Sequence, residues 1–192
     1  MKPILTSILA LGTMAFMAGT SLAEEAHVAP VTAYLNENVV PWLSDPAVIS
    51  AIKAQNEKTS GLSEADIDAL DKKWRAEVEA SDKPMISEVL GNDLSKFLQE
   101  KQAGSNGVIS EVFVMDAKGL NVGQSDATSD YWQGDEPKFQ KSFGAGKDTI
   151  FVDEVEKDES TQALQSQASV TISDESGTPI GAVTVGINMD AL

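Results

Sequence analysis

The sequence has 192 residues, with 14 Lys and Arg, 30 Asp and Glu, one His and no Cys, and its formal net charge is −16. Proteins that bind nucleic acid or an anionic membrane surface neutralise phosphates with Lys and Arg, so this charge argues against both kinds of partner. The lack of Cys excludes disulfides, a thiol nucleophile, thiolate metal sites and lipoprotein acylation. The single His27 leaves no His-based metal cluster and no Ser/His/Asp triad.

Residues 1–23 have the pattern of a cleaved signal peptide. Lys2 precedes an uncharged, mainly apolar run that ends in Ser21-Leu22-Ala23, with small residues at the two positions that a signal peptidase reads. A permanent membrane anchor is the alternative, but two glutamates follow the run where a stop-transfer segment would be basic. We therefore expect cleavage before Glu24, a periplasmic location, and a single domain over residues 24–192 with no membrane insertion after cleavage.

The first half of the mature chain has helical periodicity. Between Pro30 and about Leu98, apolar residues recur three or four positions apart. Ser63 predicts a helix N-cap, because acidic residues follow it in the first turn. Pro84 predicts the start of a further helix that continues to Leu98, with only Gly91 against it. One apolar face of the helix after Ser63 is formed by Ile67, Leu70, Trp74 and Val78.

The second half has the period of strands. Residues 108–115 and 120–124 flank a turn and predict a β-hairpin, in which Asp116 serves an Asx turn more readily than a ligand. An irregular segment follows, with a short helix expected around residues 136–143. Further strands are predicted over residues 149–155, 168–173 and 180–188. The predicted fold class is α+β, with long N-terminal helices and a five-stranded antiparallel sheet.

Three stretches of the sequence resemble the periplasmic Cache, or PDC, sensor domains, which are relatives of the PAS fold. They are the helical pattern from Ile52 to Trp74, the hairpin from Val112 to Val122, and residues 129–136 with Phe139 and Phe143. The resemblance implies a ligand held between the sheet and the loop and helix that follow the second strand. Cache domains usually lie between two membrane spans and feed a kinase, cyclase or chemoreceptor. We expect neither a second span nor an output domain here, so the resemblance implies a free-standing module with a separate membrane receptor or kinase as partner.

Amino-acid-binding members of the family place an Arg near an aromatic pair. Here the pair Tyr131-Trp132 is flanked by Asp130 and Asp135, and Arg75 is the only arginine. We therefore do not expect the same ligand specificity.

The segment after the hairpin carries the candidate ligand-binding residues. Aromatic faces with a few oriented polar groups are typical of a recognition site, and acids beside aromatic faces favour a cationic group. The alternative is that the aromatic residues form core and the acids are solvated caps. The candidate set is Asp130, Tyr131, Trp132, Gln133, Asp135 and Phe139, with Phe113, Gln124 and Asp153 from the strands and Lys138 and Phe143 nearby.

Other chemistry is disfavoured. The acidic run from Asp153 to Glu159 lacks the spacing of a calcium loop, so a strand end with a solvated charged turn is the better interpretation. The pairing of Asp130 with Asp135 or Glu136 is the one plausible catalytic pair, and nothing fixes its separation. We expect no enzyme, no cofactor and no metal. The leading hypothesis is an exported small-molecule sensor module that presents its ligand state to a membrane signalling partner; the alternative is an envelope interaction or structural protein with the same fold and no ligand.

Overall fold

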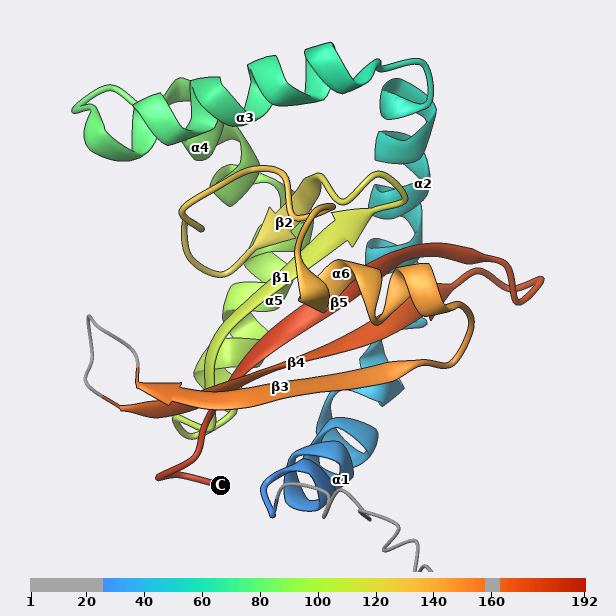
Figure 1. Ribbon diagram of the computed structural model, residues 1–192, viewed down its shortest axis with the longest axis vertical. Coiled ribbons are helices and arrows are strands. Elements are labelled where there is room, and N and C mark those ends of the chain that lie inside the picture. Colours follow the sequence, from blue (N-terminus) through green and yellow to red (C-terminus); the bar gives the residue numbers. More distant parts are fainter. Residues whose placement is uncertain (1–25, 158–162) are drawn as a thin grey trace, which may run out of the picture.

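The computed structural model describes residues 26–157 and 163–192, so the predicted signal peptide lies outside the described residues. Its centre is a five-stranded antiparallel sheet with strand order β2-β1-β5-β4-β3 (Figure 1). The strands are β1 (Ile109–Asp116), β2 (Asn121–Gln124), β3 (Ile150–Lys157), β4 (Leu164–Ser173) and β5 (Pro179–Asn188). The helices are α1 (Val28–Asn38), η1 (Val40–Trp42), α2 (Pro46–Thr59), α3 (Glu64–Glu79), α4 (Pro84–Gly91), α5 (Asp93–Gly104), α6 (Pro137–Gln140) and η2 (Phe143–Ala145).

The predicted α+β fold class is confirmed, and the predicted strands are present with shifted ends. The charged segment after Asp153 is the end of β3, as predicted, but the strand continues two residues beyond the predicted end, to Lys157. β4 begins at Leu164, and residues 158–162 lie outside the described part. The predicted helix from Pro84 to Leu98 is wrong as a single element. It divides after Gly91, because the side chain of Asn92 accepts a hydrogen bond from Ser95 N at 2.8 Å and caps α5.

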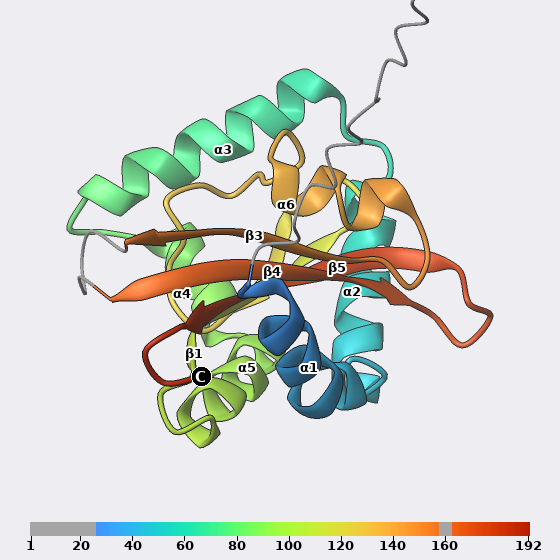
Figure 2. The ribbon, with the colours of Figure 1, turned by 60° about the horizontal axis from the view of Figure 1, so that its bottom comes forward.

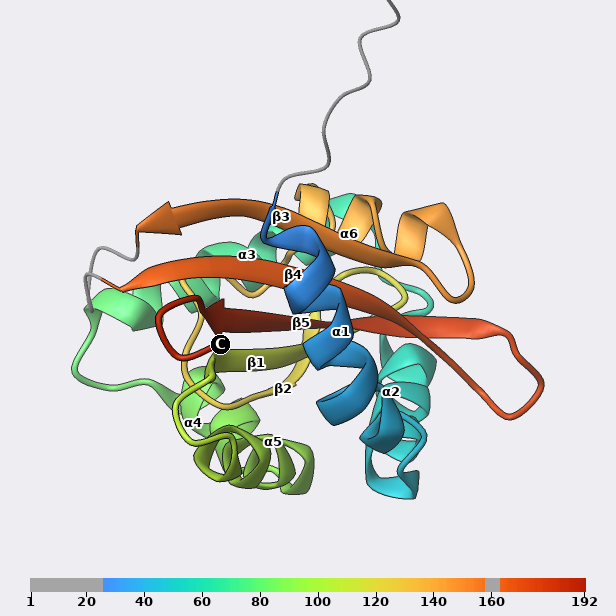
Figure 3. The ribbon, with the colours of Figure 1, turned by 90° about the horizontal axis from the view of Figure 1, so that it is seen from below.

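The sheet has two differently covered faces (Figures 2 and 3). α1, α2 and α5 cover one face, and alternate residues of the strands, such as Val112 and Val114 of β1, pack against them in the main core. The segment between β2 and β3, with α6 and η2, covers the other face. There Phe113, Met115 and Ala182 pack beneath Phe139.

α3 lies outside the main core, above the β2–β3 segment in Figure 2. Ser63 caps it as predicted, in a capping box in which the Asp66 carboxylate accepts a hydrogen bond from Ser63 N. Its apolar face forms a separate cluster around the fully buried Trp74. This satellite core also contains Ile67, Ile86, Leu120 and Tyr131, with Leu70, Val78 and Trp132 partly buried against it.

The β1–β2 turn is fixed by Asp116, in agreement with the Asx-turn interpretation. Its Oδ1 accepts hydrogen bonds from Lys118 N at 2.8 Å and Leu120 N at 3.0 Å. Gly119 has a φ of +81°, and a Cβ there would lie 2.6 Å from the backbone of Gly134. The turn therefore fits directly against the segment that follows β2.

Candidate functional site

A cavity of about 690 Å³ lies between the sheet and the start of α6. It occupies the sheet face opposite α1, α2 and α5, on the side where the resemblance implies a ligand. Three strands and the α6 segment supply its walls. The lining residues are Glu111, Glu136, Pro137, Lys138, Asp153, Glu154, Glu156, Lys157, Gln165 and Gln167.

Glu111 is held in a fixed orientation on the sheet wall of this cavity. Its Oε1 accepts hydrogen bonds from Nε2 of Gln165 at 2.9 Å and Nε2 of Gln167 at 2.8 Å. Gly186 of β5 lies between them in the sheet, paired with both Glu111 and Gln167. A Cβ on Gly186 would come 2.7 Å from Glu111 Cγ and 2.8 Å from Gln165 Nε2, so glycine leaves the space that these side chains need. A carboxylate and two amides are thus arranged before any ligand arrives.

The opposite wall carries an ion pair. Lys138 Nζ lies 2.9 Å from Glu136 Oε2, and it also lies 5.5 Å from the centre of the Phe113 ring. Burial raises the pKa of Glu136, Lys138 lowers it, and the neighbouring Asp130 raises it further. This wall therefore carries a carboxylate and a cation, and the cation lies over the ring of Phe113 from β1.

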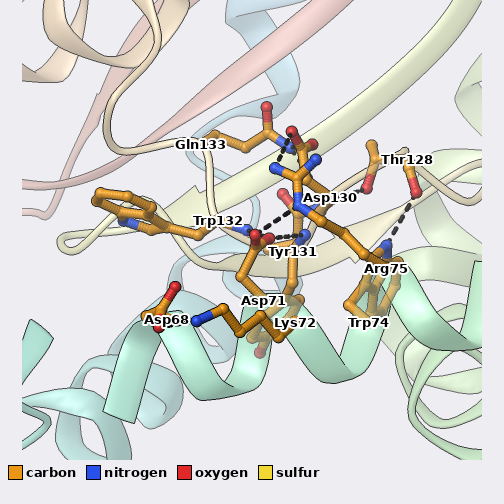
Figure 4. A network of polar contacts seen from close by, with 11 residues as sticks. Asp68, Asp71, Lys72, Trp74, Arg75, Thr128, Asp130, Tyr131, Trp132 and Gln133 are labelled. Atoms are coloured by element: carbon orange, nitrogen blue, oxygen red, sulfur yellow. Dashed lines mark hydrogen bonds and ion pairs between the residues drawn. The ribbon is translucent and has the colours of Figure 1, made fainter. Parts of the chain in front are cut away.

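The aromatic pair predicted as a ligand wall does not line the cavity, and its backbone is bonded to Asp71 of α3 (Figure 4). The Tyr131 ring stacks on Trp74 with centroids 5.3 Å apart and rings 26° from parallel. Trp132 is half-buried, and its Nε1 donates to Lys118 O at 2.8 Å. Burial raises the pKa of Tyr131 to about 12. Both aromatic residues thus belong to the satellite core, as in the alternative in which they form core.

Asp130 is buried in a network that joins this segment to α3 (Figure 4). Its Oδ2 accepts a hydrogen bond from Arg75 at 3.1 Å, and its Oδ1 accepts one from Gln133. Arg75 Nε also donates to Asp71 Oδ2 at 2.6 Å, while Asp71 Oδ1 accepts from the backbone N–H groups of Tyr131 and Trp132. The only arginine of the sequence is therefore paired to two buried carboxylates.

The other predicted site residues divide between the cavity and its surroundings. Asp153 lines the cavity, and Phe113 and Phe139 lie in the cluster beside it. Asp135 is exposed. Gln124 and Gln133 are fully buried, and each has one amide atom, Nε2 and Oε1 respectively, without a partner among the described residues. The structure thus places Asp153 in the cavity lining and Phe113 with Phe139 in one cluster, apart from the satellite core that holds Tyr131 and Trp132.

Sequence reasoning missed Glu111, Gln165 and Gln167. Each lies on a strand whose neighbouring residues face the main core. The sequence signal for a cavity-facing residue was therefore a polar side chain that alternates with apolar ones. It also gave His27 no role, whereas His27 Nε2 lies 2.8 Å from Asp153 O, which attaches the start of α1 to β3.

A second cavity, of about 310 Å³, lies between η1 and the ends of β3 and β4. Its lining is mainly apolar and includes Val40, Leu43 and Ile172, and it is far poorer in charge than the first. Within residues 26–157 and 163–192, no three Asp, Glu or His side chains gather as they would to hold a metal ion. The same residues include no helix of the length and apolar character that a membrane crossing requires.

The chain is similar to solved sensor domains of histidine kinases and of a chemoreceptor. The sensor domain of the histidine kinase DctB from V. cholerae is 13% identical, with a TM-score of 0.43, over 86% of this chain and 51% of that one. The E. coli DcuS sensor domain is 17% identical, with a TM-score of 0.38, over 64% and 91%. The sensory domain of the Campylobacter jejuni chemoreceptor Tlp3 with isoleucine bound is 16% identical, with a TM-score of 0.40, over 82% and 62%.

This chain thus spans about half the length of the DctB sensor domain. No protein-family model matches the sequence, and no curated protein matches it. At these TM-scores the similarities decide nothing about ligand or partner, which must be inferred from the site itself.

Proposed function

We propose that the chain is an exported sensor module of the Cache/PDC type that binds a small molecule in the periplasm and presents its bound state to a membrane receptor or kinase. The observation that supports this function is the cavity between the sheet and α6. Its volume of about 690 Å³ lies within the usual range for small-molecule sites, about 300–1,000 Å³. Glu111 already stands in it with two amide partners, so part of a polar recognition surface is preorganised.

The charge of the cavity favours a cationic ligand over an anionic one. Five carboxylates and two lysines line it. An anion entering this site would meet a net negative field, whereas an ammonium group would form charge-assisted hydrogen bonds with carboxylates. The proposed ligand-binding residues are therefore Glu111, Glu136, Asp153, Gln165 and Gln167. Phe113 and Phe139 support them from the adjacent cluster.

A thermal-shift screen with diamines, quaternary ammonium compounds, amino acids and dicarboxylates tests this function. A ligand at about 100 times its dissociation constant stabilises the native state by about 2.7 kcal/mol. We expect cationic compounds to stabilise the protein. Glu111→Gln and Asp153→Asn should each weaken their binding about tenfold or more, because each removes one charge-assisted contact. Glu100→Gln, which removes an exposed carboxylate of α5, is the matched control and should bind as the wild type does.

One observation favours the alternative function, an envelope interaction protein without a ligand. Tyr131, Phe139 and Trp132 are packed against neighbouring side chains, so the protein itself fills much of the space expected for a ligand. A screen in which no compound raises the melting temperature would favour this alternative. Stabilisation that is unchanged in both Glu111→Gln and Asp153→Asn would move the ligand to a site other than the cavity.

A further inference from the structure

Lys138 places a cation inside the candidate site. Its side chain is 14% exposed, although lysine side chains are usually solvated. The ammonium nitrogen is 2.9 Å from Glu136 Oε2 and 5.5 Å from the Phe113 ring centre, within the range of cation–π attraction. One carboxylate and one aromatic face therefore form a seat for a primary ammonium group.

Glu136 requires a positive partner. Its side chain is 32% exposed, and Asp130 lies beside it as a second carboxylate, already paired with Arg75. Removing the partner of a partly buried charge leaves that charge uncompensated, which is unfavourable. While Glu136 is ionised, a molecule that displaces Lys138 must therefore supply a cation of its own.

We propose that the ligand of this cavity carries a primary ammonium group that takes the place of the Lys138 ammonium between Glu136 and Phe113. Lys138 is then an internal competitor that determines ligand affinity and restricts the site to molecules able to replace it. This inference rests on the proposed function, since it names the ligand class of the same cavity.

The surroundings of Lys138 permit the exchange. Lys138 is carried by α6, a helix of four residues, and its four-carbon side chain can rotate into a cavity of about 690 Å³. After the Glu136–Lys138 pair is set aside, four carboxylates and one lysine remain in the lining. They can receive the displaced lysine or a second positive charge on the ligand, which favours a diamine.

A single metal ion fits these carboxylates poorly. In the part of the chain that the structure describes, no three acidic or His side chains converge as ligands for one ion. Carboxylates on separate walls suit an extended molecule with separated charges. Cadaverine is the direct probe, because each of its ends reproduces the alkylammonium of a lysine side chain.

The expected effect follows from competition. If Lys138 leaves this position free for only a fraction f of the time, the apparent affinity for the ligand is multiplied by f. A Glu136–Lys138 ion pair that is formed about 90% of the time therefore weakens ligand binding about tenfold. Lys138→Ala should therefore bind cadaverine about tenfold more tightly than the wild type. Lys157→Ala is the matched control, because it removes the other lysine of the lining, which is exposed. It should gain less than about threefold, from the change in net charge alone.

Isothermal titration with cadaverine at low ionic strength measures these affinities, with circular dichroism to verify folding. A gain for Lys138→Ala well above that for Lys157→Ala supports the inference, and Glu136→Gln added to Lys138→Ala should abolish the gain. The inference is overturned if Lys138→Ala gains no more affinity for cadaverine than Lys157→Ala does, gains none, or loses affinity. Cadaverine binding by the wild type would still uphold the proposed function in that case. Absence of cadaverine binding in every variant also overturns it, and the proposed function then stands or fails on the wider screen.

Chemical acetylation followed by mass spectrometry provides a readout that a purely structural role for Lys138 would not move. Cadaverine is itself a primary amine and consumes part of the reagent, so the acetylation of Lys138 is measured relative to that of Lys141, which is exposed three residues later and lies over Phe151. Cadaverine should raise the ratio of Lys138 to Lys141 acetylation, because the displaced amine becomes accessible. Protection of Lys138 by cadaverine would show that Lys138 stays in the seat, and would overturn the exchange.

Discussion

Substitution of Trp74 by alanine tests whether α3 and the segment after β2 form one packed unit. Trp74 is 0% exposed, stacks on Tyr131 at 5.3 Å, and donates from Nε1 to Thr128 O at 2.9 Å. A buried aromatic side chain removes about 150–250 Å² from water, which at about 25 cal/mol per Å² amounts to about 4–6 kcal/mol. The chain relaxes partly into the space, and Trp→Ala changes in cores cost about 3–5 kcal/mol. We expect a loss in this range.

Chemical denaturation followed by circular dichroism measures the free energy of unfolding. Trp74→Phe keeps an aromatic ring against Tyr131 and removes the N–H donor, so it should lose only about 1–2 kcal/mol. Trp132→Ala should lose less than Trp74→Ala, because Trp132 is half-buried, and it should retain ligand affinity, because Trp132 does not line the cavity. A Trp74→Ala protein within about 1 kcal/mol of the wild type would refute a satellite core that folds with the sheet.

Further measurements address other contacts. The pKa of Tyr131 is raised from 10.0 to about 12 in the folded state. Its contribution to the free energy of unfolding is therefore complete below pH 10 and is lost as the pH rises towards 12. The shift corresponds to roughly 3 kcal/mol, and Tyr131→Phe should abolish this alkaline loss in denaturation curves; an unchanged loss would assign it elsewhere. Arg75→Met should destabilise by about 1–2 kcal/mol by leaving two buried carboxylates without their cation, less so in 1 M salt; a salt-independent loss would contradict an ionic role. Ser63→Ala should lower the free energy of unfolding by about 1 kcal/mol, since it removes the cap of α3. Mass spectrometry of the exported chain should find Glu24 at its N-terminus, and intact Met1 in the membrane fraction would contradict the cleaved signal.

The elements were largely predictable because their signals are local. Ser63 and the acids after it define a helix start within four residues, and Asp116 and Gly119 define the hairpin turn in the same way. The break between α4 and α5 was missed for a physical reason. The helical period continues across Gly91, and only the side-chain cap supplied by Asn92 ends one helix and starts the next.

The position of the site was less predictable because it depends on long-range contacts. Tyr131 and Trp132 stand in a polar segment that resembles a binding loop, and their burial depends on α3, whose Asp71 bonds to their backbone from 60 and 61 residues away. Glu111 likewise meets Gln165 and Gln167 across 54 and 56 residues of sequence. Periodicity indicates the face on which each residue lies, but the strand order determines which of them meet.

Asp130 shows why the choice of residue decides what a binding experiment can reveal. Its carboxylate lies beside Glu136 of the cavity wall and also bonds to Arg75 of α3, and it is 7% exposed. Its removal would change the charge near the ligand and would also leave Arg75 without one of its partners, so affinity and stability would fall together. Glu111 and Asp153 line the same cavity from β1 and β3 and take no part in the α3 network. Their neutral amide variants change the ligand's surroundings while α3 stays attached, so they separate recognition from folding where Asp130 cannot.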